Sequence, residues 1–502
     1  MKFKKSMKRM VSMLAVLSLS ATMFVGCGSD TKGNDDNSKT ENNETKKEEK
    51  VTLKHLGAFS EFDPNTDPVA EALKEKTGYD VEYFMLPAEN AIEKLSLEIS
   101  GGTSYDSIKM NSPEYNLLTA QGALMPLDDL IDQYGPNIKK AIGEDSWNAA
   151  KVDGKIYGIP EKNSADNINL SIGVREDVLA ELGLEVPKTI DEFYNALKTI
   201  KEETDMIPLA LSSDYIFIPT IQSAFGIETN WKEIDGNLVS KVEQPGFKDY
   251  VDFMVKLYEE GLIDPDMPVN NKGNSMEKFT NGTAAMKVMA WWDAPKAIPA
   301  LEENVPGAKV AYIQPLIGKD GQQGIMKDRG ISWYTAIPKT AKNAEEAIKW
   351  IDAKFAEDTF KYFTIGEEGV HHTVQDGKYF PVLPTFFDER NRSSWYLSGI
   401  DETNYPIYWA ARVRKDENMS NAYDEFMKAQ SVASFEPLGF APALEDLAKY
   451  EKSLATLVND SVLNFIAGEG NTEGFDEFVQ KWNTSGGQAS TQAANGWYNT
   501  SK

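Results

Sequence analysis

The sequence predicts an α/β protein of two lobes, in which helices cover mostly parallel sheets. Residues 51–110 alternate between strand and helix patterns, an order typical of a parallel sheet covered by helices. The 452 residues from Val51 to Lys502 exceed what a single compact core usually holds, which favours two lobes. Cys27 is the only cysteine, so no intramolecular disulfide can form and burial of apolar side chains must hold the fold together.

The first lobe begins with elements that hydrophobic periodicity distinguishes. Val51 to Gly57 alternates apolar and polar side chains, which predicts a strand. Asp67 followed by Pro68 is a helix start, and Gly78 is a helix stop. On such signals we predict strands over residues 51–57, 79–86 and 104–110, and helices over residues 67–78 and 88–100.

Two later helices have clear start signals. Thr189 and Glu192 have the spacing of a capping box, and Asn343 with Glu346 is a second such pair. Residues 365–415 show little helical periodicity and many aromatic residues and prolines, so we expect irregular structure there. Helices are predicted to resume over residues 421–466, and we find no internal repeat.

The stretch from Phe279 to Pro295 is the strongest indication of a binding site. An apolar strand ends in Trp291, Trp292 and Asp293, and the carboxyl edge of an open α/β sheet is where ligands bind. Flat indole faces stack against sugar rings, and a carboxylate accepts hydrogen bonds from hydroxyl groups. We therefore predict that at least one of these tryptophans faces a ligand. The alternative is that one or both belong to the core.

The first 50 residues are expected to lie outside the folded part. Met1–Gly26 joins a basic start to an apolar run that is too short to span a bilayer, the pattern of a signal peptide. Residues Phe24 to Cys27 resemble a bacterial lipobox, which implies acylation of Cys27 with fatty acids such as palmitate. Residues 27–50 contain no large apolar side chain after Cys27, and we predict a disordered tether.

The charge of the chain excludes two classes of partner. The sequence contains 78 acidic and 52 basic side chains, a formal net charge of −26. Such a charge repels nucleic acid and anionic lipid surfaces, so we expect neither as a partner. The lipid on Cys27 is then the expected contact with the membrane, and the protein is expected on the extracytoplasmic face of the cell membrane.

Short motifs follow one another in a specific order. After the lipobox come the segments Gly122–Asp128, Gly154–Pro160, Val174–Leu184, Pro187–Phe193, Phe279–Met286, Ile337–Lys339, Glu368–His371 and Trp497–Tyr498. In this order they resemble the extracellular solute-binding proteins of family 1, the lipoprotein receptors of carbohydrate ABC importers. The larger oligosaccharide receptors of that family are the most similar subgroup.

The resemblance implies a fold and a function. The fold is a two-lobed periplasmic-binding-protein-like fold of type II, with several crossovers at the hinge. It assigns residues 51–165 and 313–365 to lobe 1, and residues 166–312 and 366–502 to lobe 2. A monomer of this kind would capture an oligosaccharide between its lobes and deliver it to the permease of an ABC transporter, with no cofactor and no catalysis.

Seven further residues are candidate ligand contacts. Large aromatic side chains at strand ends and in the irregular region can line a cleft, and polar side chains at strand ends can bind hydroxyl groups. The candidates are Trp231, Trp333, Trp395, Trp409, Glu61, Lys109 and Asn111. For the aromatic residues the alternative is packing in the core or within a loop, and for the polar residues it is solvation.

We expect no metal site. The segment after the helix that begins at Thr189 lacks the closely spaced oxygen ligands that calcium needs. His371 and His372 are adjacent, and on a strand they would point to opposite faces, so one metal could not easily take both. No motif of a serine hydrolase, zinc protease or phosphate loop is present. A polysaccharide-acting enzyme and a peptide-binding receptor remain the alternatives.

Overall fold

A computed structural model describes residues 51–86, 91–163, 167–328, 330–442, 444–469 and 471–501. The predicted signal peptide, the tether and Cys27 lie outside the described residues. No helix in these ranges combines the length and the apolar character that a bilayer crossing requires.

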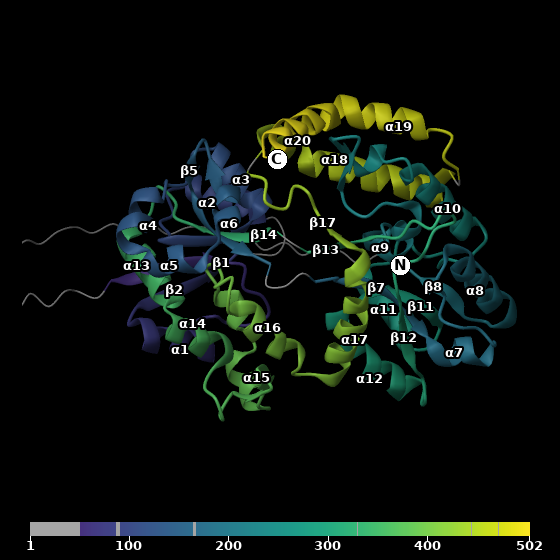
Figure 1. Ribbon diagram of the computed structural model, residues 1–502, viewed down its shortest axis with the longest axis horizontal. Helices are drawn as coiled ribbons and strands as arrows, with labels where there is room; N and C mark the ends of the chain where they lie inside the picture. The colour runs from purple at the N-terminus through teal and green to yellow at the C-terminus, as the bar shows by residue number, and fades with distance from the viewer. Residues whose placement is uncertain are drawn as a thin grey trace, which may run out of the picture. The chain divides into compact units, whose positions relative to one another are not determined.

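The first sheet has five strands in the order β2-β1-β3-β14-β6, and Figure 1 shows β1, β2 and β14 lying together. The three amino-terminal strands are parallel, whereas β14 is antiparallel to both of its neighbours. The predicted strands at residues 51–57, 79–86 and 104–110 are confirmed. The strands are β1 (Thr52–Gly57), β2 (Asp80–Met85), β3 (Ser107–Asn111), β6 (Gly158–Lys162) and β14 (Ile331–Ala336).

Helices surround the first sheet. Helix α1 starts where predicted, because the Asp67 side chain accepts a hydrogen bond from the Val69 amide, and it ends at Gly78, whose φ of 73° suits glycine. The other helices in this part are α2 (Ala91–Ser100), α3 (Ser112–Ala120), α4 (Asp128–Tyr134), α5 (Pro136–Ala141), α6 (Glu144–Ala149), α13 (Ala344–Phe355) and α14 (Glu357–Ile365), with α1 at Pro68–Thr77. A short hairpin joins β4 (Lys151–Val152) to β5 (Lys155–Ile156).

The second sheet has four strands in the order β12-β7-β11-β8. It is mixed and not mostly parallel, because β11 runs parallel to β8 but antiparallel to β7, which is also antiparallel to β12. Every residue of β11 is buried, as its apolar sequence predicts for a central strand. The strands are β7 (Leu170–Arg175), β8 (Ile207–Ala210), β11 (Ala284–Ala290) and β12 (Val310–Ile313).

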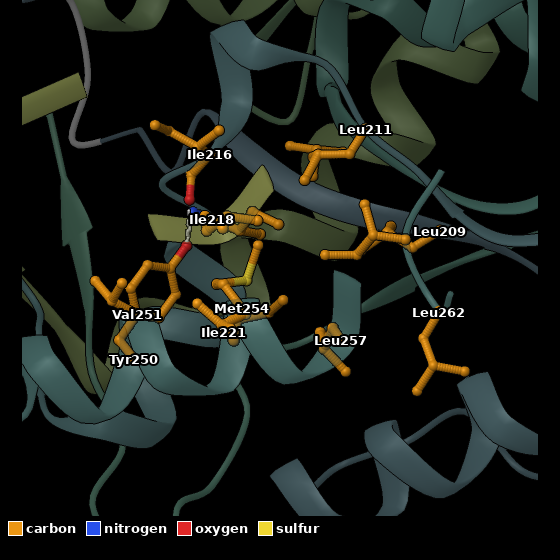
Figure 2. Close-up of a cluster of buried hydrophobic side chains, with 14 of the residues drawn as sticks. Leu209, Leu211, Ile216, Ile218, Ile221, Tyr250, Val251, Met254, Leu257 and Leu262 are labelled. Carbon is orange, nitrogen blue, oxygen red and sulfur yellow. Dashed lines mark hydrogen bonds between the residues drawn. The ribbon is translucent and has the colours of Figure 1, made fainter. Parts of the chain in front are cut away.

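The second sheet has its own core. Helix α8 begins with the predicted capping box. The Thr189 and Glu192 side chains each accept a hydrogen bond from the backbone N–H of the other residue. Figure 2 shows part of this core, where the Tyr250 hydroxyl donates to the Ile216 carbonyl at 2.6 Å and accepts from the Ile218 amide at 2.9 Å. Helices α7 (Glu176–Glu181), α8 (Ile190–Glu203), α9 (Pro219–Gln222), α10 (Phe247–Glu259), α11 (Lys272–Thr280) and α12 (Ala294–Asn304) belong to this part, with a hairpin of β9 (Trp231–Ile234) and β10 (Asn237–Ser240).

The region predicted to be irregular contains helices. It includes the hairpin of β15 (His372–Gln375) and β16 (Lys378–Pro381), then α15 (Thr385–Arg390), the short 3-10 helix η5 (Ser393–Tyr396) and α16 (Tyr405–Val413). The helices are short, which explains why periodicity did not reveal them. Phe386, Tyr396 and Tyr405 are buried in the same core cluster as Leu53 of β1.

The remaining chain crosses between the two sheets and ends in helices. Strands β13 (Ile325–Lys327) and β17 (Ala433–Phe435) pair in parallel, and α17 (Glu417–Met427) precedes β17. Helices α18 (Glu445–Leu463), α19 (Phe475–Trp482) and α20 (Gln488–Thr500) follow, and Leu454, Val458 and Trp482 join the core of the second sheet. Figure 1 shows α18 and α20 in yellow, side by side.

Candidate ligand-binding site

Several strands of the first sheet bring chemically useful side chains to one edge. Strands β1, β3 and β6 end at this edge, and β14 begins there. The edge therefore receives Lys109 of β3, Glu161 and Lys162 of β6, and Trp333 of β14, whose Cα pairs with those of both Asn111 and Glu161. Carboxyl edges of open sheets are the usual place for ligands.

A cavity of about 260 Å³ lies at this edge. Segments from beyond residue 390 close it, because η5 and α16 contribute Trp395 and Trp409 opposite the strands. The lining residues are Ala58, Lys109, Glu161, Lys162, Asn163, Ser332, Trp333, Ser394, Trp395, Leu397, Tyr405 and Trp409. Four predicted ligand residues, Lys109, Trp333, Trp395 and Trp409, are thus brought together around one cavity.

A buried ion pair forms part of the cavity wall. The Lys109 ammonium donates to Glu161 Oε2 at 2.7 Å and to the Ser394 carbonyl at 3.4 Å. Lys109 and Glu161 are only 4% and 7% exposed. The same ammonium lies 5.6 Å from the centroid of the Trp333 ring, within the range of a cation–π interaction. The wall therefore presents aromatic faces beside hydrogen-bonding groups that are already fixed in position.

A second buried lysine holds in place the segment that carries Ser394 and Trp395. Lys354 of α13 donates to the Tyr396 carbonyl at 2.5 Å and to Ser398 Oγ at 2.6 Å, which ties α13 to the segment that carries Ser394 and Trp395. Burial, and then the charge of Lys109, holds the pKa of Lys354 well below its usual value. Burial also lowers the pKa of His55, whose Nδ1 lies 2.8 Å from Ser107 Oγ.

The two tryptophans at the end of β11 have different environments. Trp292 is 44% exposed, whereas Trp291 is 8% exposed. The Trp291 ring makes edge-on contacts with Trp292 at 4.8 Å and with Trp409 at 5.8 Å between ring centroids. Trp291 therefore connects the exposed indole on the second sheet with an indole that lines the cavity at the first sheet.

Three predicted polar contacts are not among the lining residues. Asp293 accepts from the Ala290 amide at 3.0 Å and lies 3.1 Å from the Lys272 ammonium. Asn111 caps α3, because its side chain accepts from the Glu114 amide at 3.0 Å. Glu61 is exposed in the loop after β1, with a φ of 65°. The first two side chains thus stabilise local turns and helix starts.

Trp231 lies in a separate cavity of about 700 Å³. Lys241, Glu436, Asp328 and Glu451 line it as well, and it shares only Asn163 and Ser332 with the cavity described above. Those two side chains are hydrogen-bonded to each other. Burial raises the pKa of Glu436 to about 7 and lowers the pKa of Lys241 to about 8.

Several residues of the site were not predicted from the sequence. Glu161 and Lys162 follow the motif that ends at Pro160, and the strand-end reasoning that found Lys109 would have found them too. Ser394 had no comparable signal, because only the folded chain brings it to the sheet edge. Among the described residues no three or more His, Cys, Asp or Glu side chains are grouped so that they could hold a metal ion.

Comparisons with known proteins identify the family. The sequence profile of the bacterial extracellular solute-binding protein family matches residues 61–357. The chain is 41% identical over 255 residues to a Niallia circulans protein described as an uncharacterized protein in the butB 5′ region, covering 51% of this chain and all of that one. It is 30% identical to the fructooligosaccharide ABC transporter substrate-binding protein FusA of Streptococcus pneumoniae serotype 4, covering 71% of this chain and 70% of FusA.

A solved structure shares the fold. The alginate-binding protein AlgQ2, in its crystal structure without calcium ion, superposes with a TM-score of 0.72 at 21% identity and covers 90% of this chain and 98% of its own. This likeness confirms the predicted α/β solute-binding fold of type II. The chain belongs to the bacterial extracellular solute-binding protein family.

Proposed function

We propose that this chain is a lipid-anchored receptor that captures an oligosaccharide and delivers it to the permease of an ABC transporter. The observation that carries the proposal is the cavity at the edge of the first sheet, where Trp333, Trp395 and Trp409 surround the Lys109–Glu161 pair. The relationship to FusA, named as a fructooligosaccharide ABC transporter substrate-binding protein, supports the same class of ligand.

The physical basis is complementarity to a sugar. The C–H faces of a pyranose or furanose ring pack against indole, and the apolar area that they bury contributes about 25 cal/mol per Å². Sugar hydroxyl groups can donate to Glu161 and accept from Lys109 without the full cost of desolvating an unpaired charge, because the two side chains already neutralise each other.

The proposed mechanism is closure of two lobes on the ligand. The contact of Trp291 with Trp409 supports a ligand that reaches from the cavity toward the exposed face of Trp292. A solute that touches both lobes only in the closed arrangement favours closure. We keep the division of lobe 1 (51–165, 313–365) and lobe 2 (166–312, 366–502), and the packing of Phe386 and Tyr396 with Leu53 supports moving residues 385–413 to lobe 1.

Location and reaction class follow from the same proposal. A receptor anchored through lipid on Cys27 would hold the folded part outside the cell membrane, which agrees with membership of an extracellular family. The receptor would act as a monomer, without a cofactor, and would leave the sugar intact.

The test is a thermal-shift screen of residues 51–502 against plant and microbial oligosaccharides, followed by mass spectrometry of the incubated sugar. We expect at least one oligosaccharide to raise the melting temperature, with its mass unchanged after incubation. Shortened products would indicate a polysaccharide-acting enzyme, and stabilisation by peptides alone would indicate a peptide receptor. Either result would overturn the proposal.

A further inference from the structure

We infer that the oligosaccharide captured at this cavity is acidic, carrying carboxylate groups as sugars built from uronic acids do. The inference rests on the proposed function and adds the class of substrate to it. It is drawn from the local excess of positive charge around the cavity, in a chain whose formal net charge is −26.

The lining residues themselves carry more positive than negative charge. Lys109 and Lys162 line the cavity, and Glu161 is the only carboxylate among its lining residues. Glu161 is paired with Lys109 at 2.7 Å, so it offers little charge to Lys162. The Lys162 ammonium lies 3.9 Å from Glu402, which is not a lining residue, and its side chain is 28% exposed. Lys162 therefore presents a partly exposed ammonium to the cavity.

Arg412 adds a further positive charge directly behind the wall. Its guanidinium donates to Ser393 Oγ at 2.8 Å, to the Arg390 carbonyl at 3.2 Å, to Ser394 Oγ at 3.3 Å and to the Asn391 carbonyl. Each of these partners is a neutral oxygen, and no carboxylate of the described residues forms an ion pair with Arg412. Because Ser394 lines the cavity, this uncompensated charge stands one side chain away from the ligand.

The surplus of positive charge distinguishes this cavity from the neighbouring cavity around Trp231. The cavity around Trp231 is lined by the carboxylates of Asp328, Glu436 and Glu451 and by only two lysines, Lys241 and Lys327. Lys354 lines neither of the two cavities. By formal charge, the lining residues of the two neighbouring cavities thus differ in sign, with a surplus of one positive charge around Trp333 and of one negative charge around Trp231.

A uronic acid sugar fits both properties of the site. Its ring has C–H faces that can stack on Trp333, Trp395 or Trp409, and its carboxylate can accept a charge-assisted hydrogen bond from Lys162. In a partly enclosed cavity such a charge pair is screened less by salt than it would be on the open surface. A neutral sugar would make the stacking contacts alone.

The experiment compares acidic oligosaccharides with their neutral methyl esters by isothermal titration calorimetry. The probes are the trisaccharides of galacturonate, mannuronate and guluronate, each beside its fully methyl-esterified form, together with a panel of neutral oligosaccharides. We expect at least one acid to bind about tenfold more tightly than its ester at low ionic strength, the scale of a hydrogen bond to a charged group. The advantage should shrink in 0.5 M salt.

Two variants test whether the charge that binds the acid belongs to Lys162. Lys162→Gln should weaken binding of the acid about fivefold to tenfold and leave binding of the ester within about twofold. Lys319→Gln removes the same charge from a side chain that is 76% exposed and does not line the cavity, so it should change neither. If both variants weaken the acid equally, the effect comes from net charge alone and the assignment to this cavity is overturned.

The outcomes separate this inference from the proposed function. If neutral sugars or esters bind as tightly as the acids or more tightly, the acidic class is wrong while the oligosaccharide receptor stands. If no acidic, esterified or neutral oligosaccharide binds, the proposed function fails and the inference fails with it.

Discussion

The Lys109 ammonium lies 2.7 Å from Glu161 Oε2, and the two residues come from strands that are not neighbours. Strand β14 runs between β3 and β6, so the ion pair bridges over it and lies beside Trp333 of that strand. The pair therefore holds this part of the cavity wall to three strands at once. Both charges lie where water has little access, so the loss of either one would leave the other unpaired and would destabilise the protein.

Removing one partner of this pair should destabilise the protein strongly. Glu161→Gln leaves the Lys109 charge buried without its carboxylate, and such changes cost about 3–5 kcal/mol. The double variant Lys109→Met/Glu161→Leu should recover much of that loss, because no charge remains buried. Urea unfolding of the three proteins measures both effects. A Glu161→Gln variant within about 1 kcal/mol of the wild type would contradict the buried pairing.

The two tryptophans at the end of β11 should respond differently to truncation. Trp291→Ala removes a ring that is 8% exposed and should lower the free energy of unfolding by about 3–5 kcal/mol. Trp292→Ala removes a ring that is 44% exposed, so the loss should stay near 1 kcal/mol. We expect Trp292→Ala to reduce the stabilisation by sugar while the free protein stays folded. Equal losses of stability in both variants would show that Trp292 is a core residue.

Trp395 offers a test of the cavity with little risk to folding. The ring is 37% exposed and lines the cavity, so Trp395→Ala should weaken sugar binding about tenfold with a small change in melting temperature. Phe387→Ala is the matched control, because Phe387 is an aromatic residue of α15 that is 54% exposed and does not line the cavity. Calorimetric titration should show the loss in the first variant alone. Equal affinities would remove Trp395 from the site.

The raised pKa of Glu436 predicts that the stability of the protein depends on pH. Burial raises its pKa to about 7, whereas an unfolded glutamate titrates near about 4.3. Folding therefore favours the protonated form, and this contribution to stability is full below about pH 4 and is lost as the pH rises through about 7. Glu436→Gln should be about 3–4 kcal/mol more stable than the wild type at pH 8, about 1 kcal/mol more stable at pH 5 and nearly equal to it at pH 4. A constant difference across this range, measured by urea unfolding, would contradict the shift.

Much of the fold could be predicted from the sequence, because its signals are local. The alternation of Val51 to Gly57, the cap at Asp67 and the capping box at Thr189 each act within a few residues, and the structure confirms them. The helices α15 and α16 were missed, because six to nine residues are too few for a clear period.

The candidate site was harder to predict, because it depends on strand order and on distant segments. Lys109 and Glu161 meet only because β14 lies between their strands, and no local pattern specifies that order. Asn111 was predicted to contact the ligand and instead caps α3. Its spacing to Glu114 is that of a capping box, which gives the side chain a structural partner. Side chains that cap helices compete with ligands for the same strand-end positions.

The most direct test of this account is calorimetric titration of one bound oligosaccharide into the wild type, Trp333→Ala and Trp231→Ala. The two rings line different cavities, and neither is fully buried, so both variants should fold. We predict that Trp333→Ala weakens binding about tenfold or more and that Trp231→Ala binds like the wild type. Full affinity in Trp333→Ala together with loss of binding in Trp231→Ala would place the sugar in the other cavity and contradict the account.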